Sequence, residues 1–160
     1  MSLTALVRSV VPAGMHSEFW SELKANANAL GIGVHEADVE EFVEFHTAPD
    51  EGIEAVDVVL FSIDDRPSCR GSEYLLDFID YASDAEIGLP TAGQARLDLL
   101  IRFVKGVASS SMVISLEIAL TDSGDIEATR IVTAQSFRDI VQRDFLMDAP
   151  PNILYKFALQ

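Results

Sequence analysis

Apolar and polar residues alternate along this chain in patterns that predict both strands and helices. Strands are expected where β-branched and aromatic residues run together or alternate with polar ones, and helices where apolar residues recur every three or four positions. The expected strands cover residues 4–11, 32–34, 39–47, 56–63, 112–120, 126–132 and 153–159. The expected helices cover residues 17–30, 72–85, 91–108 and 136–145. This order predicts an α+β fold in which about four helices pack on a mixed or largely antiparallel sheet.

Two parts of the sheet carry strong local signals. The segment from Val56 to Ile63 is almost continuously apolar, which is typical of a central strand. Residues 112–120 alternate cleanly and are joined to residues 126–132 by the polar stretch 122–125. That arrangement predicts a β-hairpin.

The expected helix ends have side chains suited to them. Ser17 is placed to cap the first helix and Gly31 to end it, and Thr91 opens a capping-box pattern for the third. Thr133 or Ser136 is the candidate cap of the last helix. We therefore expect each of these helices to begin close to the named residue.

Length and composition bound the class of protein. A chain of 160 residues with 49% hydrophobic residues fits one folded domain, which we expect to span residues 1–160. No apolar run approaches the roughly 20 residues of a membrane span, so no membrane partner is expected. The single cysteine cannot form an intrachain disulfide. A cytoplasmic location is the expectation.

Negative charge is concentrated in the first part of the chain. The formal net charge is −15, from 26 acids against 11 lysines and arginines. Between Ala25 and Asp65 there are eleven acidic residues and no lysine or arginine. Nucleic acids are bound through lysine and arginine side chains that displace counterions from phosphates, so nucleic-acid partners are not expected.

The first functional hypothesis is an acidic protein-binding domain that occludes a basic partner. Opposed charge accelerates encounter and selects against wrong partners. Bacterial immunity proteins that neutralise nuclease toxins are a physical analogy, because they too are small, acidic and without motifs, and their carboxylates would stand in for phosphates. The expected contact residues are Glu36, Asp38, Glu40, Glu41, Glu44, Asp50, Glu51 and Glu54.

A second hypothesis is a small-molecule or metal site of an enzyme-like domain, at the end of the expected central strand. Its residues would be Asp64, Asp65, Cys69 and Arg70, where paired carboxylates and a following helix start could hold a ligand. The chain shows no catalytic or cofactor motif, and the spacing of His35 and His46 among the nearby acids is not specific for a metal. No catalytic residue, metal or cofactor is therefore assigned.

A third hypothesis is an oligomeric structural subunit. Residues 153–159, or another edge strand, would pair with the same strand of a second copy. A possible homo-oligomer thus stands beside the basic partner as an expectation.

The segment from Val10 to Ile32, VVPAGMHSEFWSELKANANALGI, resembles the opening strand and helix of sugar-binding lobes from the periplasmic-binding-protein and repressor superfamily. It covers about a seventh of the chain. The expected hairpin over 112–132 departs from that pattern, and no binding residue is carried over from it.

Overall fold

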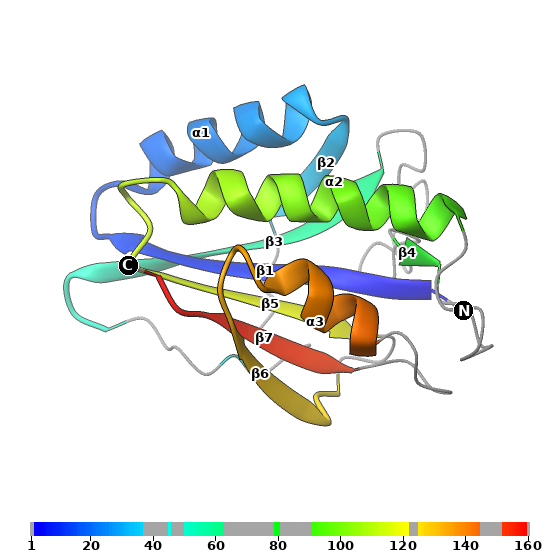
Figure 1. Ribbon diagram of the computed structural model, residues 1–160. Coiled ribbons are helices and arrows are strands. Elements are labelled where there is room, and N and C mark those ends of the chain that lie inside the picture. The colour runs from blue at the N-terminus through cyan, green and yellow to red at the C-terminus, as the bar shows by residue number, and fades with distance from the viewer. Residues whose placement is uncertain are drawn as a thin grey trace.

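The protein is an α+β structure built on a mixed β-sheet (Figure 1). The computed structural model describes residues 2–36, 45, 50–62, 79–80, 91–121, 125–144 and 152–159. Within them the strands are β1 (Ser2–Pro12), β2 (Ile32–Glu36), β3 (Ile53–Ser62), β4 (Ile79–Asp80), β5 (Ser115–Thr121), β6 (Ala128–Val132) and β7 (Ile153–Phe157). The helices are α1 (His16–Ala29), α2 (Thr91–Ala108) and α3 (Phe137–Asp144).

Six of these strands lie side by side in the order β2-β3-β1-β5-β7-β6, and the two-residue β4 pairs with the start of β1. All neighbours are antiparallel except β6 and β7, which are parallel. Apart from the two-residue β4 between β3 and α2, the path β1-α1-β2-β3-α2-β5 with the strand order β2-β3-β1-β5 is that of a split β-α-β, or ferredoxin-like, arrangement. β7 and then β6 extend that sheet beyond β5, and α3 lies between these two strands in the chain.

The three helices cover one face of the sheet (Figure 1), with α2 lying between α1 and α3. Apolar side chains that alternate along each inner strand meet them there, as Val7, Val58 and Ile118 do in one row across β1, β3 and β5. α3 is seated by Phe137, whose ring lies edge-on to Tyr155 of β7 with centroids 5.3 Å apart. The main hydrophobic core is therefore the layer between the sheet and the helices.

The helix ends follow the sequence in part. Gly31, at φ +72°, ends α1 as expected, because a residue without a Cβ adopts this conformation at little cost. The expected cap Ser17 is wrong: α1 begins at His16 and its cap position is Met15, which makes no side-chain cap bond. At α3, Thr133 and Ser136 act together, since the hydroxyl of each accepts a hydrogen bond from the backbone N–H of the other.

The expected hairpin over residues 112–132 is wrong in its pairing. β5 and β6 are both present, but β7 lies between them and pairs with each. β7 is buried along almost its whole length, so its apolar side chains gain more from an inner position than from an edge. For the same reason residues 153–157 are not an edge available to a second copy; the outer strands of the described sheet are β2 and β6.

The expected helix over residues 72–85 is wrong at Ile79 and Asp80, which form β4 against Ser2 and Leu3. The rest of that segment lies outside the described residues, as does the expected strand 39–47 apart from Phe45. Three helices rather than about four are therefore found in the part of the chain that the structure describes.

Candidate functional site

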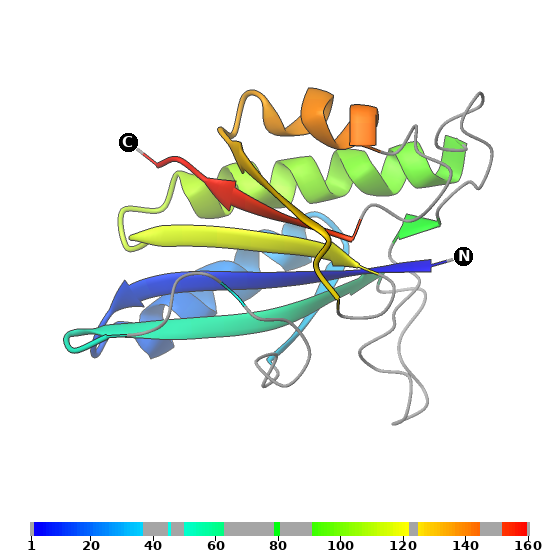
Figure 2. The same cartoon turned by 90° about the horizontal axis from the view of Figure 1, so that it is seen from below.

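Two tight turns meet at one end of the sheet. After β1 the chain turns so that Met15 N donates to Pro12 O (3.1 Å), and Ala13 N donates to Gly52 O (2.9 Å), directly before β3. Gly52 has a φ of +86°, a conformation that favours glycine. Figures 1 and 2 both show the end of β1 and the start of β3 at the same end of the molecule. Acidic residues beside either turn are therefore brought together.

Five acidic residues lie on the elements that border these turns, and we call this set the acidic end. Glu18 lies in the first turn of α1, Asp50 and Glu51 precede β3, and Glu54 of β3 lies opposite Val11 of β1. The fifth, Glu36, lies opposite Val58 of β3 and contacts His16 at the start of α1. The members of the acidic end are Glu18, Glu36, Asp50, Glu51 and Glu54.

Few neutralising partners of the acidic end are found among the described residues. Glu36 Oε1 lies 2.9 Å from His16 Nε2, and this contact links the end of β2 to the start of α1. Asp50 accepts a local hydrogen bond from the backbone N–H of Glu51 at 2.7 Å. Within the described residues none of the acidic end's other four members forms an ion pair. Their field therefore extends into solvent.

Four of the expected contact residues, Glu36, Asp50, Glu51 and Glu54, belong to the acidic end, although they come from different strands and loops. The other four lie outside the described residues, namely Asp38, Glu40, Glu41 and Glu44. Glu18 was missed by the sequence analysis. Its signal is an acid in the first helical turn, but nothing local to α1 says that this turn lies beside β3.

The opposite face of the sheet contains a row of alternating charges. Arg8 of β1 lies between Asp57 of β3 and Glu117 of β5, and Glu117 in turn lies opposite Lys156 of β7. Arg8 donates to both carboxylate oxygens of Asp57, from Nε at 2.8 Å and from Nη2 at 2.9 Å. The ring of Phe45 covers the guanidinium, with its centroid 4.8 Å from Cζ.

This row is an internal, balanced charge system. Arg8 and Glu117 are only 2% and 0% exposed, and apolar neighbours on the same face such as Leu6 and Leu154 are fully buried as well. Moving charges out of water is costly, so groups placed there need partners of opposite sign. Arg8, the base nearest the acidic end along β1, is thus committed to Asp57 and does not neutralise the acidic end.

A second buried polar group ties α3 to the sheet. Asp144, at the end of α3, accepts hydrogen bonds from the Tyr155 hydroxyl at 2.8 Å and from Arg130 Nη2 at 3.3 Å. Burial, and after it the negative charge of Asp144, raises the pKa of the Tyr155 phenol far above its usual range. Tyr155 is therefore a permanent hydrogen-bond donor to Asp144, which is a structural role.

The expected ligand site cannot be placed on this fold. Its residues, Asp64, Asp65, Cys69 and Arg70, follow β3 and lie outside the described residues, as does His46. Among the residues that are described, no three His, Cys, Asp or Glu side chains are grouped so that they could hold a metal ion. No helix in that part of the chain combines the length and apolar content needed to cross a membrane.

Comparisons with known proteins add no further constraint. The chain matches no protein-family model, no curated protein and no solved structure. The functional argument therefore depends on the geometry and charge described above.

Proposed function

We propose that this protein is a binding module for a basic protein partner, which docks on the acidic end. The observation that supports the proposal is that acidic residues from three separate stretches of the chain border this end of the sheet, and that four of the five form no ion pair within the described residues. Like charges held together reduce folding stability through repulsion. A cationic surface docked on them would relieve that repulsion.

Charge would bring the partner to this end, and apolar contact would hold it. With a net charge of −15 the protein attracts a cationic protein from a distance, which raises the association rate by about 10- to 1000-fold at low salt. Trp20, one turn after His16 on α1, is only partly buried. Aromatic side chains of this kind often supply the central anchors of protein interfaces.

In its narrower form, the module is an inhibitor of a toxin or nuclease, comparable to immunity proteins. A nuclease presents a cationic groove to the phosphates of its substrate, and the carboxylates of Asp50, Glu51 and Glu54 would occupy that groove in their place. This form requires that the bound partner lose its nuclease activity. The Asp64–Arg70 ligand site and the oligomeric subunit remain predictions, since no contact in the described residues favours either.

The test is comparative capture of a partner from the cells that make the protein, with two matched variants. Glu18→Gln/Glu51→Gln removes two charges from the acidic end, and Glu127→Gln/Asp139→Asn removes two exposed charges that precede β6 and lie on α3. We expect the first variant to bind the captured partner with an association rate about three- to tenfold lower at low salt, and the second to change it less than twofold. If both variants bind alike, or if wild-type protein retains no basic protein, the proposal is wrong. A partner with nuclease activity that the protein blocks would support the narrower form.

A further inference from the structure

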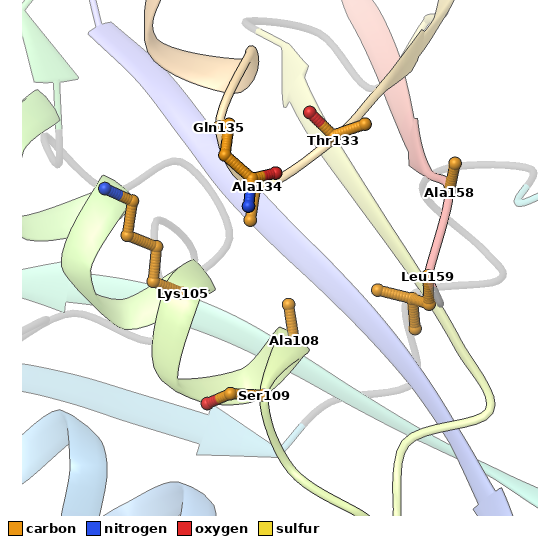
Figure 3. A pocket seen from close by; sticks show the side chains of 8 residues that line it. All are labelled: Lys105, Ala108, Ser109, Thr133, Ala134, Gln135, Ala158 and Leu159. Carbon is orange, nitrogen blue, oxygen red and sulfur yellow. The ribbon is translucent and has the colours of Figure 1, made fainter.

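A cavity of about 510 Å³ has a lining that includes no residue of the acidic end (Figure 3). It is open to solvent on one side and is bordered by three segments that are distant in sequence: the last turn of α2, the loop between β6 and α3, and the residues that follow β7. Its volume falls within the range of about 300 to 1000 Å³ that is typical of small-molecule sites.

The walls of this cavity are held by the backbone. Ala158 N donates to Val132 O at 2.8 Å, which fixes the end of β7 against the end of β6. In the loop before α3, Phe137 N donates to Thr133 O at 3.0 Å, and at the end of α2, Ser109 N donates to Lys105 O at 3.1 Å. These backbone hydrogen bonds fix the other two walls. The space between these fixed walls exists because the lining includes Ala108, Ala134 and Ala158, whose methyl groups leave it unfilled. A ligand would therefore enter a preformed site.

The lining has a chemistry unlike that of the rest of the protein. Among the described lining residues Lys105 is the one that is charged and none is an aspartate or glutamate, in a chain with 26 acids and 11 lysines and arginines. Lys105 forms no ion pair or hydrogen bond with its side chain in the described part of the protein. Figure 3 shows Lys105 at the rim of the hollow, with its ammonium directed outward, and Gln135 near it; Leu159 is on the opposite side, with Ala108 and Ala134 between.

We propose that this cavity binds a small organic carboxylate that bears an apolar group. The carboxylate would accept hydrogen bonds from the Lys105 ammonium and the Gln135 amide, and the apolar group would lie on the alanine methyls against Leu159. The cationic lining accounts for the preference for an anion. The proposal uses no residue of the acidic end and does not rest on a partner bound there.

The test is an amide-resolved NMR titration of the full chain with 3-phenylpropanoate, which carries both groups, and with the uncharged 3-phenylpropan-1-ol. A ligand of this size binds in the millimolar range at ordinary efficiency, so the titration extends to about 10 mM. We expect saturable shifts with the carboxylate at Ser109, Thr133–Gln135 and Ala158–Leu159, and binding of the alcohol that is about tenfold weaker or more.

Two lysine variants provide the control. Lys105→Met keeps the apolar stem and removes the charge, and it should weaken carboxylate binding about tenfold or more; Lys24→Met, on α1, should leave it within about twofold. Both residues are exposed, so neither variant is expected to impair folding. The proposal is overturned if no saturable shift occurs, if the shifts lie elsewhere, or if Lys105→Met binds the carboxylate as wild type does.

Discussion

Replacing Arg8 by methionine removes the positive charge that lies between the carboxylates of Asp57 and Glu117. The Arg8 and Asp57 side chains are 3% and 12% exposed, and they share hydrogen bonds of 2.8 and 2.9 Å. Breaking a buried ion pair by removing one partner costs about 3 to 5 kcal/mol, because the remaining charge stays buried. We expect Arg8→Met to lower the free energy of unfolding by that amount, and Tm by about 10 °C.

An exposed pair of the same type is the matched control. Arg138 pairs with Asp98, and their side chains are 41% and 49% exposed. Arg138→Met should therefore cost no more than about 1 kcal/mol. Urea unfolding, followed by the fluorescence of Trp20, the only tryptophan, and by circular dichroism, measures both variants. If Arg8→Met costs no more than Arg138→Met, the row of charges does not contribute as described.

A double-mutant cycle separates the ion pair from the loss of packing. In Arg8→Met/Asp57→Asn both members of the pair are neutral, so the double variant should be more stable than the sum of the single effects implies, by about 1.5 kcal/mol or more. Strict additivity would mean that the cost of Arg8→Met does not come from the pair with Asp57, and that it comes from the other neighbours of Arg8, Phe45 and Glu117.

Three smaller perturbations test other contacts. A glycine-to-alanine change inside a helix usually stabilises it by about 0.5 to 1 kcal/mol. Gly106→Ala should instead destabilise the protein by about 1 kcal/mol, because the new Cβ would lie 2.5 Å from Asn26 Nδ2. In urea unfolding this cost should disappear when Asn26 is also replaced by alanine. Since the unfolded chain loses the Tyr155 proton around the usual phenol pKa of 10 and the folded protein retains it, stability should fall above pH 10 by up to about 1.4 kcal/mol per pH unit, and Tyr155→Phe should remove that part of the slope. Ile131→Thr, at a position 75% exposed on β6, should change stability by less than about 0.5 kcal/mol and leave the mass measured by light scattering unchanged.

Local patterns in the sequence predict most of the elements but not their neighbours. The apolar stretch at Val56–Ile63 corresponds to the inner strand β3, and the alternation of Leu116, Ile118 and Leu120 identifies the helix-facing side of β5. The hairpin expectation fails because β7, which is more than twenty residues further along the chain than β6, competes for the same edge of β5 and buries more apolar surface there. Because the two competing strands are distant in sequence, a turn pattern between β5 and β6 cannot predict which of them pairs with β5.

The partners of the buried charged residues are likewise not predictable from local sequence patterns. In an alternating strand, Glu117 reads as a solvent-facing position, yet it is fully buried because the second face of the sheet is also covered. Its neighbours Arg8 and Lys156 come from the two ends of the chain, so the balance of charge appears only once β1, β5 and β7 are adjacent. The dense acids before β3 are visible in the sequence, whereas the addition of Glu18 depends on the contact between the two turns at Ala13 and Gly52.

The central claim is that the acidic end, in which four of five carboxylates form no ion pair within the described residues, is one accessible cation-binding surface. Amide-resolved NMR titration with an arginine-rich peptide, nona-arginine, tests it most directly. The account predicts that the largest shifts fall on residues 13–18, 36 and 50–54, and that Glu18→Gln/Glu51→Gln reduces them while Glu127→Gln/Asp139→Asn does not. Shifts spread evenly over the surface, or equal in the two variants, would contradict it.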